Sequence, residues 1–288
     1  MVGIDEYILA MFLISILAGL IGAMVGLGGG ILVVPALTIV FGIPIEYAIG
    51  ASIISTIATS SGSASAYVKD RITNLRIGMF LEIGSVLGSL VGVLTTLYFV
   101  KSGLSWVIFI IFGLVLVFSA YNVYQNARME REGLSMVNTT PNETARRLKL
   151  SGEYEDTRLK ARVPYVATRV PAGFVVIFSA GLMSGLLGVG GGVLKVLGMD
   201  TLMKLPFKVS TTTSNFMIGV TATASTGILY VGGYVNLVLA APVALGVVAG
   251  SMGGARLLLR SKPASIRILF IVVLLLLGAE MILTGVQH

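Results

Sequence analysis

Several kinds of residue are missing from this chain or scarce in it, and each absence removes a class of function. None of the 288 residues is cysteine, so disulfide bonds and thiolate metal sites are excluded. The single histidine is His288, which leaves no histidine for a catalytic dyad or a metal site within the apolar segments. The sequence therefore predicts a protein that is not an enzyme and that carries no metal or other cofactor.

Charged residues are also scarce. Only 11% of the residues are Asp, Glu, Lys or Arg, whereas a soluble domain has about 25%. Hydrophobic residues make up 56%, and apolar windows of roughly 20 residues, the length that crosses a bilayer as a helix, follow one another along the chain. These features predict an all-α polytopic membrane protein. The net charge of +7 is concentrated in the connections, which is typical of membrane topology rather than of nucleic-acid binding.

One unit of the sequence is written twice. The run Gly26–Gly30 returns as Gly188–Gly192, and the offset of 162 residues holds without a gap from Ala18/Ala180 to Gly92/Gly254, with about 20 identities in 75 pairs. The paired positions include Pro44/Pro206, Ser52/Ser214, Thr59/Thr221, Asn74/Asn236 and Gly88/Gly250. Duplicated halves that each contain a broken apolar helix indicate a secondary transporter with a binding site at the breaks.

Hydropathy divides the chain into three parts. Residues 1–124 form a first transmembrane repeat, residues 125–169 a polar, basic linker with too few apolar residues for a core, and residues 170–288 a second repeat. The apolar segments are Tyr7–Val25, Ile31–Phe41, Tyr47–Val68, Leu75–Val100, Leu104–Tyr124, Val170–Leu187, Val193–Met203, Val209–Val231, Asn236–Leu259 and Ser265–Thr284.

The distribution of Lys and Arg predicts how these segments are threaded. Basic residues gather at Lys69–Arg76, in the linker, at Lys204–Lys208 and at Arg256–Arg267, and basic connections face the cytoplasm. All four lie on one side only if residues 170–203 enter the membrane and return on the same side. By symmetry, residues 7–41 form the same hairpin from outside. The expected fold is two inverted repeats, each a glycine-broken re-entrant hairpin followed by three transmembrane helices. The linker is then cytoplasmic and both termini are outside; eight full spans are the alternative.

The two glycine runs are the first candidate binding elements. Glycine permits tight turns, and the unpaired N–H groups at the start of the returning helix suit an anion. We therefore expect Gly28, Gly29 and Gly30, together with Gly190, Gly191 and Gly192, to contact substrate. The alternative is that these glycines only allow close helix packing. A nucleotide-binding loop is not expected, because no Lys-Ser/Thr follows either run.

A face rich in hydroxyl and amide groups follows each run. Helical spacing places several of these side chains on one face, where they are able to bind oxyanion oxygens without a permanent charge. The alternative for any one hydroxyl is a hydrogen bond to a carbonyl oxygen of its own or a neighbouring helix. The candidate substrate-binding residues on these faces are Ser52, Thr56 and Thr59 in the first copy, and Ser214, Asn215 and Thr221 in the second.

Four ionisable residues interrupt the apolar segments. Charges at membrane depth are costly and mark candidate functional sites. Lys195, three residues after the second glycine run, is a candidate to bind an anion directly; pairing with Asp200 is a weaker alternative, because i, i+5 is a poor helical contact. Glu82 and Glu280 lie within about two turns of an expected membrane face, so we expect both to extend to the interface.

The repeated pattern resembles the sulfite exporter TauE/SafE family, also called the toluene sulfonate uptake permease group. The resemblance rests on the two GxGGG runs followed by a short apolar helix, a proline and a Ser/Thr-rich helix, with IGAS at Ile49–Ser52 and TTTS at Thr211–Ser214. It implies an inverted-repeat carrier of small sulfur-containing or organic anions, with glycine breaks at Gly26, Gly28–Gly30, Gly188 and Gly190–Gly192, and with small or hydroxyl positions at Ser52 and Ser214. Lys195 and Asp200 depart from the apolar residues that are commoner there.

Together these features predict a secondary active transporter in the cytoplasmic membrane. It would move sulfite, sulfoacetate or other sulfonates by alternating access, and its expected partners are a small anion, the lipid bilayer and a coupling ion, with no nucleic acid. An anion channel and a carrier of a different small solute are the alternatives. The sequence leaves open the identity of the anion, the direction of transport, the choice of H⁺ or Na⁺ as coupling ion, and whether the protein is a homo-oligomer.

Overall fold

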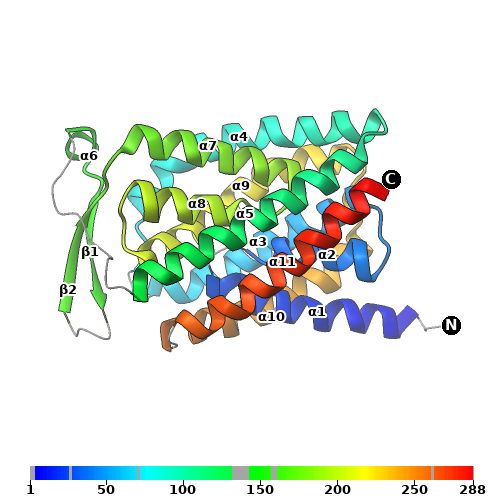
Figure 1. Cartoon of the computed structure of the whole chain (residues 1–288), viewed down its shortest axis with the longest axis horizontal. Helices are drawn as coiled ribbons and strands as arrows, with labels where there is room; N and C mark the ends of the chain where they lie inside the picture. Colours follow the sequence, from blue (N-terminus) through cyan, green and yellow to red (C-terminus); the bar gives the residue numbers. More distant parts are fainter. Residues whose placement is uncertain are drawn as a thin grey trace.

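The protein, described here from a computed structural model, is a bundle of helices with a small sheet at one end (Figure 1). The structure describes residues 4–25, 28–69, 72–131, 143–156, 161–260 and 263–287. The first half comprises α1 (Ile4–Val25), α2 (Gly30–Pro35), the π-helical η1 (Ala36–Val40), α3 (Ile45–Lys69), α4 (Leu75–Lys101) and α5 (Ser105–Arg131). The second half comprises α7 (Val170–Leu187), α8 (Gly192–Leu197), η2 (Gly198–Leu202), α9 (Phe207–Val231), α10 (Leu237–Arg260) and α11 (Pro263–Gln287).

The broken helices fold back on themselves in both halves. In the first, the Tyr7 hydroxyl near the start of α1 donates to the carbonyl oxygen of Phe41 at 3.0 Å, just after η1 ends. In the second, the backbone N–H of Thr168, just before α7, donates to the carbonyl oxygen of Met203 at 3.0 Å, just after η2. Each α–break–α–η segment therefore starts and ends at the same place, as the charge distribution predicted for a hairpin.

The two halves exchange their closest packing partners. Helix α1 packs along α10, and α7 packs along α4, so each hairpin lies against a helix of the other half. Glycines permit these approaches: a Cβ at Gly88 would overlap the carbonyl oxygen of Phe178, and a Cβ at Gly250 would overlap that of Ile16. The second contact repeats the first at the offset of 162, because Gly250 corresponds to Gly88 and Phe178 corresponds to Ile16. The duplicated small residues are therefore sites of backbone-to-backbone packing.

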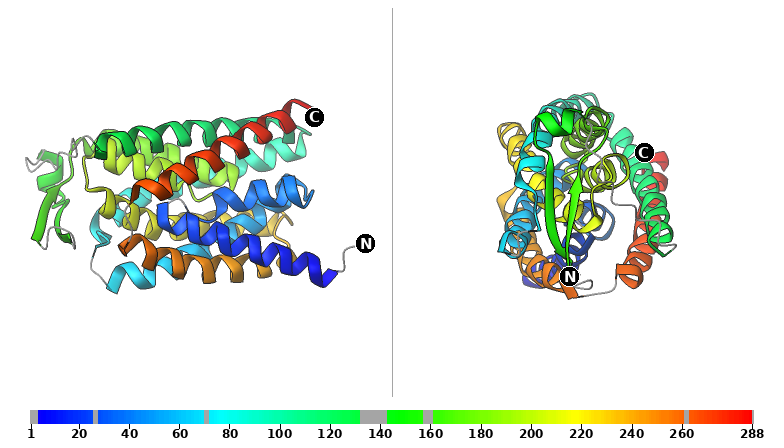
Figure 2. Two further views of the ribbon diagram at one scale, coloured as in Figure 1. Left: turned by 60° about the horizontal axis from the view of Figure 1, so that its bottom comes forward. Right: turned by 90° about the vertical axis from the view of Figure 1, so that its left-hand side faces the viewer.

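Equivalent helices run in opposite directions. In Figure 1, α1 runs from the end that holds both termini toward the middle, and α7 runs toward the middle from the end that holds the linker. Helices α5 and α11, the last helix of each half, pack against each other at the edge of the bundle (Figure 2). The chain termini thus lie at one end of the bundle and the linker at the other.

Five of the described helices are long and apolar enough to cross a membrane. They cover Glu6–Met24, Leu75–Lys101, Ser105–Asn122, Val170–Leu187 and Leu237–Leu257, and Ile271–Gln287 is a shorter apolar helix. The chain is thus a polytopic helical membrane protein. Helices α3 and α9 are not in this set although each has 25 residues, because Ser and Thr lower their hydropathy; both pack inside, each against the other.

The linker is more structured than its composition suggested. Helix α5 continues to Arg131, past the expected boundary at Tyr124, and the linker contains α6 (Glu143–Arg147) and an antiparallel pair, β1 (Ser151–Asp156) with β2 (Ala161–Val166). The strands lie across the end of the bundle (Figure 2). The fold is therefore not purely helical. The sequence prediction that the linker has too few apolar residues for a core of its own did not anticipate that a few of these residues are buried against the bundle.

The docking of the linker is specific. Ala145, Leu150 and Tyr165 are buried in one cluster with Ile77 and Leu81 of α4. The Asn74 amide, at the start of α4, donates to the Tyr165 hydroxyl at 3.0 Å. Burial raises the pKa of Tyr165, and the bond from Asn74 partly opposes that rise.

Candidate functional site

The two glycine breaks meet in the interior of the bundle, between α3 and α9. Gly28, Gly190 and Gly191 have positive φ values of 75°, 73° and 65°, a conformation that glycine adopts without strain. The carbonyl oxygen of Gly188, in the second break, accepts a hydrogen bond of 2.7 Å from Ser52 in the first half. Gly26 and Leu27 lie outside the described residues. The breaks predicted from the duplication therefore contribute to a single central region.

The two halves use the same serine contact at their breaks. Ser52 donates to the carbonyl oxygen of Gly30 at 3.2 Å, and Ser214 donates to that of Gly192 at 3.3 Å. These residues are equivalent by the offset of 162. The space is tight as well, since a Cβ at Gly30 would lie 2.6 Å from the hydroxyl oxygens of Ser52 and Thr56. This shared contact holds the first turn of each returning helix against the helix that follows it.

Most hydroxyl groups on the predicted binding faces already donate their one proton to a hydrogen bond within the protein. Thr56 donates to the carbonyl oxygen of Ser52 at 2.8 Å, and Thr59 donates to that of Ser55 at 2.8 Å while it accepts from the Gly29 N–H at 3.3 Å. Asn215 donates to Ala23 of α1 at 3.4 Å. The hydroxyl faces therefore line the breaks, as the sequence indicated, but in this arrangement they mainly satisfy backbone carbonyls.

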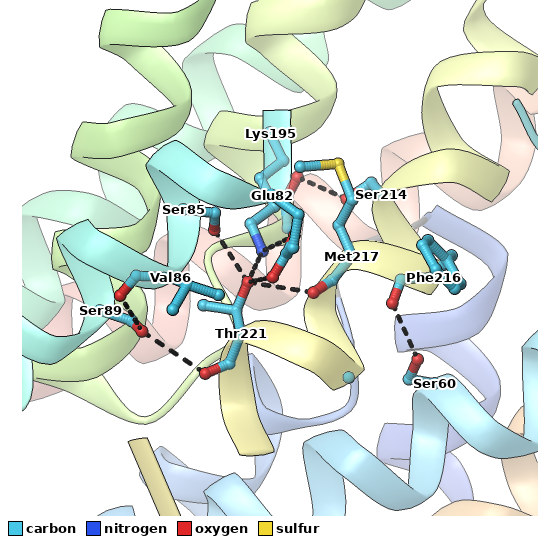
Figure 3. A network of polar contacts seen from close by, with 12 residues as sticks. Ser60, Glu82, Ser85, Val86, Ser89, Lys195, Ser214, Phe216, Met217 and Thr221 are labelled. Carbon is cyan, nitrogen blue, oxygen red and sulfur yellow. Dashed lines mark hydrogen bonds and ion pairs between the residues drawn. The ribbon is translucent and has the colours of Figure 1, made fainter. Parts of the chain in front are cut away.

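The strongest electrostatic feature is a buried charge pair that joins the halves (Figure 3). Lys195 of α8 is fully buried, and its ammonium donates to the Thr221 hydroxyl of α9 at 2.5 Å. Glu82 of α4 is 6% exposed, and its Oε2 lies 4.0 Å from Lys195 Nζ. The expectation that Glu82 extends to the membrane interface was wrong, because α4 turns this side chain toward α8 and α9. Lys195 is thus paired with Glu82 rather than with Asp200.

The hydroxyl of Thr221 is the centre of this cluster. It accepts from Lys195 and donates to Glu82 Oε1, and the Ser85 hydroxyl lies 2.8 Å away. A threonine hydroxyl has one proton and two acceptor positions, so Lys195 and Ser85 donate to Thr221, and its one proton is shared between Glu82 Oε1 and the Met217 carbonyl oxygen, which is 3.0 Å away. The other carboxylate oxygen, Glu82 Oε2, is buried without a hydrogen-bond partner. One acceptor in the cluster is therefore unsatisfied in this state.

The described residues of the two breaks and of the Lys195 cluster are buried. The cavity beside the second break has a volume of about 10 Å³ and is bounded mainly by apolar side chains, among them Ile31, Val115 and Met183. Such a volume holds at most one water molecule. Access for a solute to the breaks and to Lys195 therefore requires the surrounding helices to separate.

The fold and the site together define a class: a polytopic helical membrane protein with duplicated halves, each with a broken helix, and with a buried charge pair close to the second break. The family model described as "Sulfite exporter TauE/SafE" matches residues 11–281, and the chain belongs to this family. No solved structure matches it.

Curated relatives extend over almost the whole chain. This chain is 28% identical over 282 residues to "Probable membrane transporter protein YunE" of Bacillus subtilis (strain 168), and the alignment covers 95% of this chain and 96% of that protein. It is 24% identical over 287 residues to "Probable membrane transporter protein MJ0441" of Methanocaldococcus jannaschii, covering 95% and 94%. Family membership and these relatives support a membrane transporter.

Proposed function

We propose that this protein is a secondary transporter of small anions that works by alternating access at the cytoplasmic membrane. The candidate substrates are sulfite, sulfoacetate and other sulfonates, in line with its family. The observation that carries the proposal is the fully buried ammonium of Lys195, three residues after the second glycine break and close to where the two breaks meet. A buried cation is costly unless an anion neutralises it.

In this structure Glu82 is that anion, and the other surroundings of Lys195 favour a small oxyanion as the partner that replaces Glu82 during transport. An ammonium has three donors, and among the described residues only Thr221 accepts from it by hydrogen bonding. Sulfite and sulfonate groups present several acceptor oxygens and form strong charge-assisted hydrogen bonds. Gly190, Gly191 and Gly192 lie at the start of the helix that carries Lys195, so their N–H groups are additional candidate donors.

An alternating-access mechanism agrees with the packing of the two halves. Exchanged contacts related by the 162-residue offset, and equivalent helices that run in opposite directions, support an inverted repeat. In such folds one repeat rocks against the other around a central site. Burial of the described residues at the breaks and around Lys195 suits a carrier that opens to one side at a time better than a passive pore.

The charge distribution supports a cytoplasmic linker and termini outside. The linker lies at the end of the bundle that includes the start of α4 and the end of α10, where basic residues gather (Figure 1). Because the chain has no cysteine, single cysteines report sidedness directly. A cysteine at exposed Ser151 of the linker should react with an impermeant maleimide only after cells are opened; labelling in intact cells would reverse the orientation.

Counterflow in proteoliposomes tests the function. Vesicles loaded with unlabelled sulfite or sulfoacetate should accumulate the labelled anion transiently and saturably. Gly191→Val should abolish this, because Gly191 has a φ of 65° and a Cβ there would overlap the carbonyl oxygen of Ala180. Gly253→Val is the matched control, since no atom lies within 4 Å of a Cβ at that exposed position.

The outcomes separate the alternatives. Saturable counterflow in the wild type and Gly253→Val, lost in Gly191→Val, supports an anion carrier with its site at the breaks. Flux that rises linearly with concentration and shows no counterflow indicates a channel. Tight vesicles with folded protein that accumulate no anion would refute the proposal and favour a different solute.

A further inference from the structure

We propose that Glu82 is the proton-coupling group of this transporter: the anion displaces the Glu82 carboxylate from Lys195, and Glu82 takes up one proton when it loses that partner. This inference rests on the proposed anion transport and specifies its coupling ion. The observation behind it is the juxtaposition of Lys195 Nζ, Thr221 Oγ1 and the carboxylate of Glu82 in the closed centre, with Glu82 Oε2 unpartnered and 4.0 Å from the ammonium (Figure 3).

Charge balance is the first step of the argument. In the structure the buried cluster is neutral, with one ammonium and one carboxylate held on the two sides of a single hydroxyl. A monovalent anion that enters without a proton leaves the cluster with a net charge of −1 in a site that excludes water, at high cost. A proton from solvent on Glu82 Oε2 restores neutrality. The loaded cluster then contains one ammonium, one anion and one neutral carboxylic acid.

The surroundings single out Lys195 as the charge that Glu82 faces. Helix α7, which packs along α4, has no ionisable residue, and α9 has Lys208 and Tyr230 only near its two ends. On α4 itself, Arg76 and Lys101 lie near opposite ends. Other ionisable residues near α4 are Tyr98 on α4, Asp200 on η2, and Tyr121, Tyr124, Arg128, Glu130 and Arg131 toward the end of α5. The linker that docks on the start of α4 adds Arg146, Lys149, Tyr154 and Tyr165.

Hydrogen bonding couples the same event to the conformation. Glu82 belongs to the first half, and Lys195 and Thr221 belong to the second, so the cluster bridges the two repeats. When the anion takes the ammonium, Thr221 loses one of the two donors that it accepts from and keeps Ser85, and the protonated Glu82 becomes a donor itself. The cluster is neutral when empty and when loaded with anion and proton together. The cluster is charged when only the anion or only the proton is bound, and this charge disfavours closure of the transporter around it. The ratio of transport is therefore one proton per monovalent anion.

The test measures proton movement together with anion movement. Proteoliposomes with an internal pH dye should show one proton entering per monovalent sulfonate, and an inwardly directed proton gradient should drive accumulation that a membrane potential does not change. In Glu82→Gln, gradient-driven net uptake should fall at least tenfold more than counterflow does, and no proton should accompany the anion. Glu280→Gln, an exposed glutamate on α11, is the matched control and should behave as the wild type.

Each outcome has a distinct meaning. Counterflow in Glu82→Gln shows that the variant is folded, so selective loss of the proton-driven component supports the inference. Gradient-driven uptake in Glu82→Gln at the wild-type ratio to counterflow would overturn it, as would sodium-driven uptake in the wild type without proton movement; both leave the anion carrier intact. A wild-type protein with no anion counterflow would overturn the proposed function and this coupling with it.

Discussion

The two copies of the central site share a backbone arrangement but differ in charge. In the second copy Lys195 and Thr221 meet Glu82; the residues at the equivalent positions, offset by 162, are Val33, Thr59 and Ala244. Thr221 accepts from an ammonium, whereas Thr59 accepts from the backbone N–H of Gly29. The threonine is thus common to both copies, and the ion pair is confined to one.

This comparison separates the scaffold from the chemistry. The glycine breaks, the serine contacts of Ser52 and Ser214, and the glycine-mediated packing occur in both halves, so they serve the geometry of the fold. The charge pair breaks the symmetry, and its cost in a membrane interior needs a functional explanation. We therefore expect substitutions at the shared features to have similar effects in both halves. Substitution of Lys195 should have an effect that substitution at the equivalent position of the first half does not have.

Removal of Lys195 should have the largest effect on stability. In Lys195→Met the carboxylate of Glu82 is left buried and uncompensated, which costs about 3–5 kcal/mol. Val33→Met, at the equivalent apolar position, should cost about 1–3 kcal/mol at most, from overpacking alone. Thermal unfolding in detergent at neutral pH compares the two.

The double variant Lys195→Met/Glu82→Leu sharpens this test. It removes both charges, so it should be more stable than Lys195→Met although it changes more residues. Equal unfolding temperatures for Lys195→Met and Val33→Met would show that the pair is electrostatically unimportant and would remove the asymmetry on which the comparison stands.

Packing at the duplicated glycines should be affected equally in both halves. Leucine at Gly88 or at Gly250 would overlap the carbonyl oxygen of Phe178 or of Ile16, and each change should cost about 1–3 kcal/mol or prevent assembly. Gly253→Leu, in open space, is the control. The yield of monodisperse protein measures the effect, and a loss confined to one half would argue against equivalent packing.

The serine contacts should give the smallest difference. Ser52 lies within hydrogen-bond distance of two carbonyl oxygens, those of Gly30 and Gly188, whereas Ser214 donates to that of Gly192. Ser52→Ala should therefore cost about 1–2 kcal/mol and Ser214→Ala about 0.5–1.5 kcal/mol. Unfolding temperatures measured side by side test the ranking, and a larger loss for Ser214→Ala would contradict it.

Much of the scaffold could be predicted from the sequence, because the duplication and the distribution of charge are patterns that extend over many residues. The 162-residue offset located both breaks, and the Lys and Arg clusters required hairpins that return to their own side, as the Tyr7–Phe41 and Thr168–Met203 contacts show. The linker was not readable in the same way. Its apolar residues are few, and only the surface of the bundle at Ile77 and Leu81 completes their core.

The candidate site was readable in part. Lys195 and Thr221 were both singled out, since a lysine after a glycine break and a repeated threonine are local signals. Their partner Glu82 is 113 residues away from Lys195 along the chain, and its distance from an expected membrane face suggested exposure. Which side of α4 faces α8 depends on the packing of the two halves, which the periodicity of a nearly uniformly apolar helix does not reveal.

The central claim is tested most directly by the concentration dependence of anion counterflow in Lys195→Met and Val33→Met, reconstituted side by side with the wild type. The account predicts that Val33→Met saturates as the wild type does, and that Lys195→Met shows no saturable counterflow or a half-saturating concentration at least tenfold higher. A wild-type half-saturating concentration in folded Lys195→Met would show that the buried ammonium does not bind the transported anion.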